Sequence, residues 1–470
     1  MKASTALSTE MSVSRFFVIS TLLLTLMFGA ALLLSFEAMA QTEEDKAEAH
    51  FIELVVSPDK EFNKTLASIE ATWKPSYLAL SLDVLSLAWE VKMRERLIDL
   101  MQRKKGQSFG EDMNGWYRWM WNQPEARHPH YAQFKSNLFK YIDPRFAGYF
   151  DDAREDTIRL DEVRWGGVKQ DGIPPLRQPT MIAADEADYL EDSNVVFGVE
   201  INGDARAYPK RILAWHEMFV DEIGGMQFAG VYCTLCGAVI LYETLHNGTQ
   251  YNIGTSGFLY RSNKLMYDKT TQSLWSTTRG EPVIGPLVGK GIQLQRSYLV
   301  TTTWGEWKRR HPHTSVLSVK TGHSRNYREG VAYQQYFATD DLMFNVPNED
   351  ARLNNKDEIL ALTFPKLNDE KLAIHAAYLA SNPIYYDAMG EKKFVVLTDT
   401  SGANRVYQAG KVRFVEYDQA ESVIDENGLK WALSESRLSS QQGDELQRLP
   451  AHRAFWFGWV AAHPDTRLIK

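Results

Sequence analysis

The chain repeats part of itself, and this repetition constrains its fold more strongly than any other feature of the sequence. A Trp-x-x-Trp segment begins at Trp304 and returns at Trp456, 152 residues later, and a His-Pro pair follows both at the same spacing. A second set of matches, at an offset of 166 residues, pairs Ala207, Leu213, Asp221, Gly224 and Phe228 with Ala373, Leu379, Asp387, Gly390 and Phe394. Because the matches keep the same order, the sequence predicts two related halves, at about 180–325 and 355–470.

Comparing the two halves separates residues that a shared fold needs from residues that one half alone carries. Trp304, Trp307, His311 and Pro312 have counterparts in or near the same positions of the second half, so we interpret them as structural. The features found in the first half alone are Trp215, His216, Cys233, Cys236 and the segment 255–263. The second half lacks all of these features together. Their joint absence indicates that they belong to one site.

The spacing of apolar residues predicts a helical region before the repeated part. Leu78, Leu82, Leu85 and Trp89 recur at intervals that place them on one helix face. We expect residues 43–150 to form a small HEAT-like module of paired helices, acting as a spacer or as a docking surface for another protein. Its aromatic cluster is interpreted as core, and comprises Trp116, Trp119 and Trp121.

Beyond a turn-rich boundary at 164–179, the hydrophobic period changes to two, which is typical of strands. Three turn pairs between apolar runs predict β-hairpins, namely Asn202-Gly203, Gly224-Gly225 and Asn247-Gly248. The sequence therefore predicts an α+β protein in which a duplicated, mostly antiparallel β-rich domain follows the helical module. The first copy is expected at 164–345 and the second, degenerate copy at 355–470.

The first forty residues have the pattern of a targeting segment. An apolar run at 16–36 follows Lys2 and Arg15, and it ends at the small-x-small site Ala38-Met39-Ala40. This pattern predicts a secretory signal peptide over residues 1–40. The run is also long enough to span a bilayer, so an uncleaved membrane anchor is the alternative. In both cases we expect the remaining chain to be periplasmic, or otherwise outside the cytoplasm.

Charge and cysteine content exclude several classes of protein. The chain has 52 Lys and Arg residues against 60 Asp and Glu residues, a net charge of -8. Nucleic acid is therefore not expected as a partner, because binding phosphates needs clustered positive charge. The cysteines number only two, so a disulfide-stapled scaffold is excluded as well.

Those two residues form a Cys-x-x-Cys-Gly motif between two apolar runs, which predicts a strand-turn-strand placement. In this setting Cys233 and Cys236 resemble the knuckles of metal sites, where backbone amides point at the sulfurs. A third ligand would have to come from elsewhere, and His216 is the candidate. Two thiolates and one imidazole are a soft donor set that suits copper or zinc. The preferred hypothesis is therefore a transition-metal site formed by Cys233, Cys236 and His216.

Three alternatives to metal binding stay open. Cys233 and Cys236 could form a redox-active dithiol, a purely structural disulfide in a non-enzymatic interaction protein, or a Cys/His nucleophile. Side chains expected near the site, as hydrogen-bonding partners of the ligands or contacts of a substrate, are Trp215, Ser256, Tyr260 and Asn263. Neither a reaction nor a substrate follows from these residues.

Several motifs together resemble one known family. They are Asp171-Gly172-Ile173-Pro174, the segment 199–209, Trp215-His216-Glu217, the segment 232–237 and Thr303-Trp304-Gly305-Glu306-Trp307. From 164 to the C-terminus the chain resembles the bacterial family catalogued as domain of unknown function 3179. The family usually has Pro where this chain has Thr234, which loosens the knuckle analogy. The resemblance implies a secreted or membrane-anchored protein preceded by HEAT-like helices, and it implies no activity.

Overall fold

The computed structural model describes residues 46–56, 59–88, 90–364 and 370–470. The predicted signal peptide and Trp89 lie outside these residues. Backbone contacts divide the chain into two compact units, Met1–Glu111 with Ala126–Phe134, and Asp112–Glu125 with Lys135–Lys470. Within the described residues, no helix combines the length and apolar character needed to cross a membrane.

The first unit is helical, as the apolar spacing predicts. Its helices include α2 (Asp59–Ala71), α3 (Tyr77–Leu87) and α4 (Val91–Lys105). Leu78, Leu82 and Leu85 are all buried on α3. Helix α4 ends at Gly106, which has φ +64° and donates its N–H to the carbonyl of Gln102. This left-handed glycine is a common way to end a helix, because it satisfies a carbonyl that would otherwise lack a partner.

The second unit begins with α5 (Met113–Trp121), which carries the tryptophan cluster. Trp116 and Trp121 are buried, and the Trp121 indole donates to the carbonyl of Asp161 at 3.1 Å. Helix α6 (Tyr131–Phe139) and three short 3-10 turns follow, η1 (Pro144–Gly148), η2 (Leu160–Glu162) and η3 (Ala184–Glu186). This part of the chain leads into the β-rich region.

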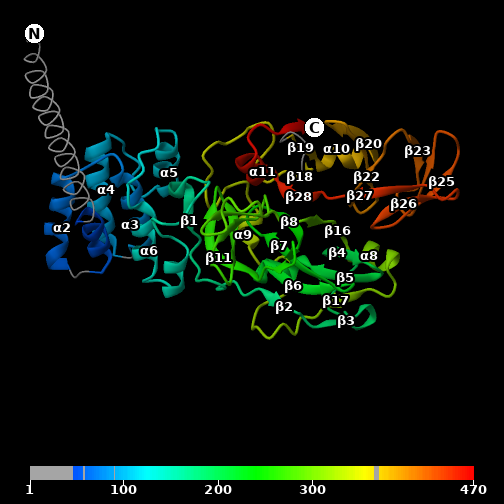
Figure 1. The fold of residues 1–470 in the computed structure, drawn as a ribbon, viewed down its shortest axis with the longest axis horizontal. Helices are drawn as coiled ribbons and strands as arrows, with labels where there is room; N and C mark the ends of the chain where they lie inside the picture. Colours follow the sequence, from blue (N-terminus) through cyan, green and yellow to red (C-terminus); the bar gives the residue numbers. More distant parts are fainter. Residues whose placement is uncertain (1–45, 57–58, 89, 365–369) are drawn as a thin grey trace, which may run out of the picture. The chain divides into compact units, whose positions relative to one another are not determined.

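Two of the sheets in the first copy have counterparts in the second (Figure 1). One has the order β16-β4-β5-β17-β3, and the other has the order β15-β8-β7-β6-β2. The strands are β2 (Leu176–Arg177), β3 (Met181–Ala183), β4 (Val195–Ile201), β5 (Asp204–Pro209), β6 (Met218–Ile223), β7 (Met226–Cys233), β8 (Ala238–Glu243), β15 (Arg296–Ser297), β16 (Val300–Thr303) and β17 (Ser315–Leu317). Two short helices connect them, α7 (Lys210–His216) and α8 (Trp304–Arg310).

The second copy has the same connectivity. Its strand orders β28-β18-β19-β29 and β20-β21-β22-β27 correspond to β16-β4-β5-β17 and β6-β7-β8-β15 of the first copy. The elements are β18 (Glu358–Thr363), β19 (Lys371–His375), α10 (Ala376–Ser381), β20 (Ile384–Met389), β21 (Lys392–Thr398), β22 (Asn404–Gln408), β27 (Glu445–Leu449), β28 (His452–Phe455), α11 (Trp456–Ala462) and β29 (Arg467–Ile469). The fold class is α+β and the strand pairing is mostly antiparallel, as the sequence predicts.

Each copy carries its own additional strands. In the first copy, a sheet of order β1-β11-β12-β13-β14 contains the segment 255–263. Its strands are β1 (Val163–Trp165), β11 (Ile253–Tyr260), β12 (Asn263–Asp268), β13 (Leu274–Ser276) and β14 (Glu281–Ile284), and a separate hairpin pairs β9 (Leu245–His246) with β10 (Thr249–Gln250). In the second copy, four strands extend the larger sheet, β23 (Phe414–Tyr417), β24 (Ser422–Asp425), β25 (Lys430–Leu433) and β26 (Arg437–Ser440). Helix α9 (Gln334–Phe337) lies between the copies in the sequence.

All three predicted hairpin turns are confirmed. The pairs Asn202-Gly203, Gly224-Gly225 and Asn247-Gly248 have positive φ at both positions and join adjacent antiparallel strands. Two consecutive positive φ values define the type I′ turn, whose twist matches that of the flanking strands. Glycine and asparagine adopt this conformation at little cost.

The repeated tryptophans form the same contacts in both copies. The indole of Trp307 donates to the hydroxyl of Thr314 at 2.9 Å, and the indole of Trp459 donates to the hydroxyl of Thr466 at 2.9 Å. Each tryptophan also packs on the histidine four residues later, with ring centroids 4.1 Å and 4.3 Å apart. These contacts fit the structural role that the sequence comparison suggests for them.

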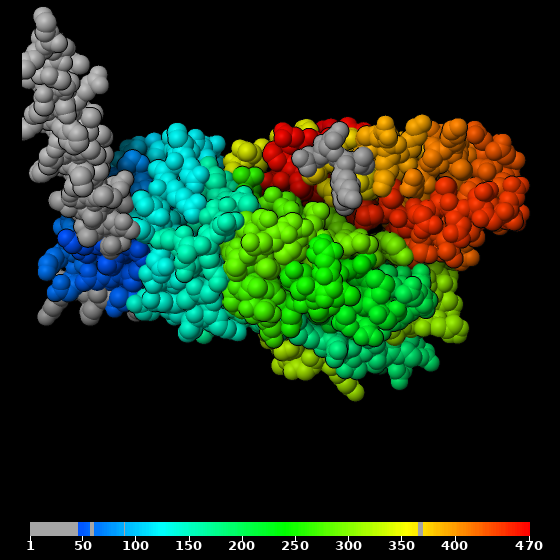
Figure 2. All heavy atoms as spheres, in the orientation of Figure 1, coloured from blue at the N-terminus to red at the C-terminus, as the bar shows by residue number. Residues whose placement is uncertain are grey.

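The two copies cover one another reciprocally. Trp304 and Trp307 of α8 share a hydrophobic cluster with Ala403 of the second copy. Trp456 and Trp459 of α11 share another cluster with the cysteine turn of the first copy. In the space-filling view, the red and orange atoms of the second copy lie directly against the green atoms of the first (Figure 2). The Trp-x-x-Trp helix of each copy therefore buries part of the other.

The second copy also contains a buried cluster of charges beside α8. Arg405, fully buried, binds Asp399 at 2.7 Å and Glu435 at 2.7 Å. Arg448 binds Glu435 at 3.0 Å, and Arg310 of the first copy lies 3.7 Å from Asp399. Burial would raise the pKa of Glu435, but Arg405 and its other partners hold that pKa well below the usual range.

We expect Arg405→Met to lower the free energy of unfolding by about 3 kcal/mol or more, because it leaves two buried carboxylates short of a partner. Urea denaturation of the purified chain measures the change. The control is Arg437→Met, since Arg437 is half exposed and binds Glu445 at the surface. We expect this control to lose less than about 1 kcal/mol. Equal losses in the two variants would contradict a structural role for the buried cluster.

Candidate functional site

The Cys-x-x-Cys motif lies in a tight turn between two adjacent strands. Strand β7 ends at Cys233 and β8 begins at Ala238, and these two residues pair across the hairpin. The turn is closed by Gly237 in the left-handed region, with φ +59°. A Cβ atom at Gly237 would lie 2.9 Å from the ring of Phe455, so the close approach of the second copy also requires glycine.

The two sulfurs face one another inside this turn. Their Sγ atoms lie 2.7 Å apart, and the N–H of Cys236 donates to the carbonyl of Cys233 at 3.1 Å. Both thiols are free, and their exposed fractions are 2% and 0%. A disulfide bond has a length of about 2.05 Å, so closing the pair requires only a small side-chain movement.

A strained turn in the additional sheet approaches the second sulfur. The thiol of Cys236 lies 3.1 Å from the carbonyl oxygen of Ser262, to which it can donate. Arg261 and Ser262 both have positive φ, 48° and 61°, between β11 and β12. Non-glycine residues seldom adopt this conformation, and it places the Ser262 carbonyl against Cys236.

The second copy covers the same sulfur. A Cβ atom at Gly458 of α11 would lie 2.9 Å from the Cβ of Cys236 and 3.4 Å from its sulfur. The N–H of Phe455 donates to the carbonyl of Cys236 at 2.7 Å, and Asn263 donates from Nδ2 to the Gly458 carbonyl at 2.9 Å. The start of α11 is therefore held against the cysteine turn.

A buried ion pair lies beside the first cysteine. The ammonium of Lys264 binds the carboxylate of Glu217 at 2.8 Å, and the side chains are only 6% and 9% exposed. The same ammonium donates to the carbonyls of Glu217 and Tyr232, at 3.0 Å and 3.3 Å. Glu217 ends helix α7 in the left-handed region, with φ +55°. The ion pair brings both a positive and a negative charge next to Cys233.

These surroundings separate the pKa values of the two thiols. Burial and the carboxylate of Glu217 would raise the pKa of Cys233, but its hydrogen bond with Cys236 and the charge and backbone N–H of Lys264 outweigh them and lower that pKa. Burial and the neighbouring sulfur raise the pKa of Cys236 well above its usual value. Cys233 is therefore the sulfur that ionises first, and Cys236 keeps its proton.

His216 has other partners in the structure. Its Nδ1 lies 2.9 Å from the carbonyl of Pro174, and its Nε2 lies 2.6 Å from the hydroxyl of Tyr327. The imidazole is fully buried, and burial lowers its pKa to about 4. Both ring nitrogens are thus engaged in hydrogen bonds. The neighbouring Trp215 is half-buried and donates its indole N–H to the carbonyl of Asn326 at 2.9 Å.

The other candidate residues divide between the site and the scaffold. Asn263 lies next to the cysteine turn, through its bond to Gly458. Ser256 is buried within the additional sheet, where its hydroxyl donates to the carbonyl of Leu265 at 2.6 Å. Tyr260 lies under the guanidinium of Arg261, whose central carbon is 5.1 Å from the ring centroid. Of the three, the structure brings Asn263 close to Cys236.

Among the described residues, no group of three or more His, Cys, Asp and Glu side chains could hold a metal ion. Cys233, Cys236 and His216 all belong to the described part of the chain, so they do not form such a group. A metal bound by the two thiolates would need further ligands from outside this set, because structural zinc takes four. The arrangement as it stands is a close pair of thiols with unequal acidity.

Sequence comparison missed the residues that set this acidity. Glu217 belongs to the Trp215-His216-Glu217 motif, but the sequence alone indicates no role for it. Lys264 lies 47 positions further along the chain. The antiparallel hairpin of β11 and β12 carries Lys264 to the cysteine turn. Lys264 lies in β12, a strand whose residues are all buried. A lysine in such a strand indicates a buried partner, because a fully buried lysine without one is rare.

We expect His216→Asn to change how stability depends on pH. The folded pKa of about 4 lies below the ordinary value of about 6.5, so neutral His216 stabilises the fold above pH 6.5. This contribution falls as the pH drops from 6.5 to 4, because the unfolded chain takes up the proton first. Urea denaturation across this range should show the gap between wild type and His216→Asn shrinking toward pH 4. His313→Asn, at an exposed position, is the control. A gap that stays constant would contradict the buried, neutral state of His216.

Comparison with known proteins identifies a family for this fold and site. A family model described as "Protein of unknown function (DUF3179)" matches residues 170–466, which include both copies and the cysteine turn. No curated protein and no solved structure matches the chain. Because the matched segment covers well over half of the sequence, the chain belongs to the DUF3179 family.

Proposed function

We propose that this protein is a dithiol–disulfide redox protein acting outside the cytoplasm, with Cys233 and Cys236 as the redox pair. The observation that carries the proposal is the geometry of the pair, with sulfurs 2.7 Å apart in one tight turn and unequal pKa values. Cys-x-x-Cys spacing allows a disulfide to open and close reversibly. The location is inferred from the N-terminal targeting pattern.

The proposed exchange begins at Cys233, the more acidic thiol. Its thiolate attacks one sulfur of a substrate disulfide, whose S–S bond breaks and whose other sulfur leaves as a thiol after taking up a proton. Cys236 then loses its proton and attacks the Cys233 sulfur of the mixed disulfide. The second substrate thiol is released, and Cys233 and Cys236 become a disulfide. Two electrons and two protons have passed from the pair to the substrate.

Burial determines which disulfides can take part. Both cysteines are buried, and Gly458 of α11 packs on Cys236. A bulky protein disulfide cannot reach them in this arrangement. Exchange therefore requires a local movement of α11 away from the turn, and we expect it to be faster with small disulfides than with folded protein substrates.

The metal hypothesis has less support than redox exchange. It relied on His216 as a ligand, and both nitrogens of His216 are hydrogen-bonded to Pro174 and Tyr327. Binding copper or zinc through His216 would break one of these bonds and move a fully buried ring. Copper and zinc binding nevertheless stays a prediction, which elemental analysis of the purified protein can test.

We expect the pair to oxidise and re-reduce reversibly at a defined potential. The mature chain would be equilibrated in glutathione buffers of graded ratio, quenched with acid, alkylated under denaturing conditions and weighed by mass spectrometry. A two-electron transition between about -120 and -300 mV would match known exchange proteins. The Cys233→Ser/Cys236→Ser double variant is the control and should show no transition.

Three results would contradict redox exchange. A disulfide that stays intact below about -300 mV would indicate a structural bond. Thiols that never pair at any ratio would remove the redox role. About one copper or zinc per chain, lost in the double variant, would favour the metal site.

The hydrogen bond between the sulfurs gives a second prediction. We expect Cys236→Ala to raise the pKa of Cys233, because alanine cannot donate to the thiolate. Cys236→Ser keeps a donor in the same place and should raise that pKa less. Ultraviolet absorbance of the thiolate, followed against pH, measures both. If Cys236→Ala and Cys236→Ser gave the same value as the wild type, the interaction between the sulfurs would not set the acidity of Cys233.

A further inference from the structure

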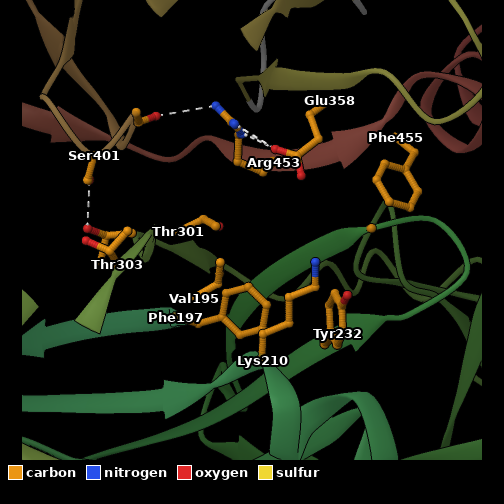
Figure 3. A pocket seen from close by; sticks show the side chains of 13 residues that line it. Val195, Phe197, Lys210, Tyr232, Thr301, Thr303, Glu358, Ser401, Arg453 and Phe455 are labelled. Carbon is orange, nitrogen blue, oxygen red and sulfur yellow. Dashed lines mark hydrogen bonds and ion pairs between the residues drawn. The ribbon is translucent and has the colours of Figure 1, made fainter. Parts of the chain in front are cut away.

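A second feature of the structure is a cavity of about 200 Å³ where the two copies meet. Figure 3 shows its lining side chains, which come from the first copy on one side and from the second copy on the other. The first copy contributes Lys210 and Tyr232, and the second contributes Glu358, Arg453 and Phe455. Nothing in the proposed redox exchange requires such a cavity.

Equivalent positions of the two copies line the cavity with different chemistry. Thr301 and Arg453 are 152 positions apart and both face it, as do Thr303 and Phe455. The shared fold therefore explains why a hollow exists at this place, between matching strands β16 and β28. The shared fold does not explain why equivalent positions carry different residues. These differences make the cavity asymmetric and place charged groups in it.

Two hydroxyl groups and one ammonium at the cavity have no hydrogen-bond partner among the described residues. The hydroxyl of Tyr232 lacks one although the side chain is only 1% exposed, and the Thr301 hydroxyl lacks one as well. Lys210 is half-buried, and within the described part of the chain its ammonium forms no hydrogen bond or ion pair. In Figure 3, the ammonium of Lys210 and the hydroxyl of Tyr232 point into the same space. A buried polar group without a partner is costly, so this space suits a ligand that accepts hydrogen bonds.

The charge balance of the cavity favours an anion. Glu358 is already bound by Arg453, whose Nη2 and Nε lie 2.7 Å and 3.2 Å from one carboxylate oxygen. Arg453 is further engaged by the side-chain oxygen of Asn404 at 2.6 Å. Within the described residues the ammonium of Lys210 forms no ion pair, although its charge contributes to the lowered pKa of Glu358. Lys210 and Arg453 against Glu358 leave one net positive charge at the cavity. The Lys210 ammonium also makes a cation–π contact with Phe337, 5.1 Å from the ring centroid, which supplies no hydrogen-bond acceptor.

Part of the remaining wall is apolar, next to the hydroxyl-bearing side chains of Thr302, Thr303 and Ser401. Phe197 packs on Tyr232 with ring centroids 5.0 Å apart, and Phe455 lies on the opposite side. The volume is below the roughly 300–1,000 Å³ of pockets for drug-sized ligands. One cation without an ion-pair partner suits a ligand with a single negative charge. A multiply charged phosphate suits it less well, because phosphate usually binds several donors.

We propose that this cavity binds a small organic monocarboxylate with a short apolar body. The carboxylate would pair with Lys210 and accept hydrogen bonds from Tyr232 and Thr301, while Phe197 and Phe455 contact the apolar part. The site is distinct from the sulfurs, because its recognition groups are an ammonium, two hydroxyls and an aromatic wall. A failure of the carboxylate proposal would therefore leave the redox proposal unchanged, and the reverse also holds.

Calorimetric titration of the mature chain with butyrate and with benzoate tests this site. Butylamine and inorganic phosphate, at the same ionic strength, are the comparison probes. We expect saturable binding of at least one carboxylate at one site per chain, and weaker or no binding of the amine and of phosphate. Lys210→Met should weaken carboxylate binding about tenfold or more, because it removes the charge-assisted contact with the ammonium. Tyr232→Phe, which keeps the ring and removes the hydroxyl, should weaken it about threefold to tenfold.

The control is Lys308→Met, since Lys308 is an exposed lysine of α8 that binds Asp192 and is not among the residues that line the cavity. Its affinity for the carboxylate should equal that of the wild type. The proposal is overturned if neither carboxylate binds, if phosphate or butylamine binds more tightly, or if Lys210→Met and Tyr232→Phe both bind as the wild type does. Because Tyr232→Phe is nearly isosteric, it keeps the test valid even if Lys210→Met folds poorly.

Discussion

The structure of the β-rich region depends on one interaction, the burial of each copy's turn under the Trp-x-x-Trp helix of the other. Helix α11 lies on the cysteine turn, where the N–H of Phe455 donates to the carbonyl of Cys236 at 2.7 Å. Helix α8 packs in the same way near Ala403. Large aromatic side chains dominate such contacts because each buries a large apolar area. Each turn is buried against the helix of the other copy, so the burial of both turns depends on the packing between the two copies.

Both turns are buried, but the side chains that occupy them differ in chemistry. In the second copy, Asp399 starts the turn and its carboxylate is neutralised by the buried guanidinium of Arg405. In the first copy, Cys233 occupies the corresponding strand end, and its environment is tuned by Lys264 and Glu217. Either set of side chains, the Asp399–Arg405 ion pair or the two cysteines, could serve a purely structural role at such a turn. The use of two ionisable sulfurs in one copy only is the reason to assign the chemistry to that copy.

The sequence predicted much of the scaffold and less of the site. Hairpin turns such as Asn202-Gly203 were predictable because they depend on local φ preferences. The α+β class was predictable because hydrophobic period is also local. His216 was placed with the cysteines because all three are absent from the second copy, yet its nitrogens bind Pro174 and Tyr327. Joint absence from the second copy gives no information about the hydrogen-bond partners of each side chain. The partner of Glu217 lies 47 positions away, beyond what local spacing can show.

The thiols and the cavity share a wall. Tyr232 and Gly237, which flank the cysteine turn, both line the cavity, and Phe455 contacts both features. Any movement of α11 that exposes Cys236 must also displace Phe455, and so it removes one side of the cavity. A ligand held there by Lys210 and Tyr232 would favour the closed position of α11, since it binds that state alone. Occupation of the proposed site would therefore oppose access to the sulfurs, because the packing that holds the two copies together forms the cavity and covers Cys236.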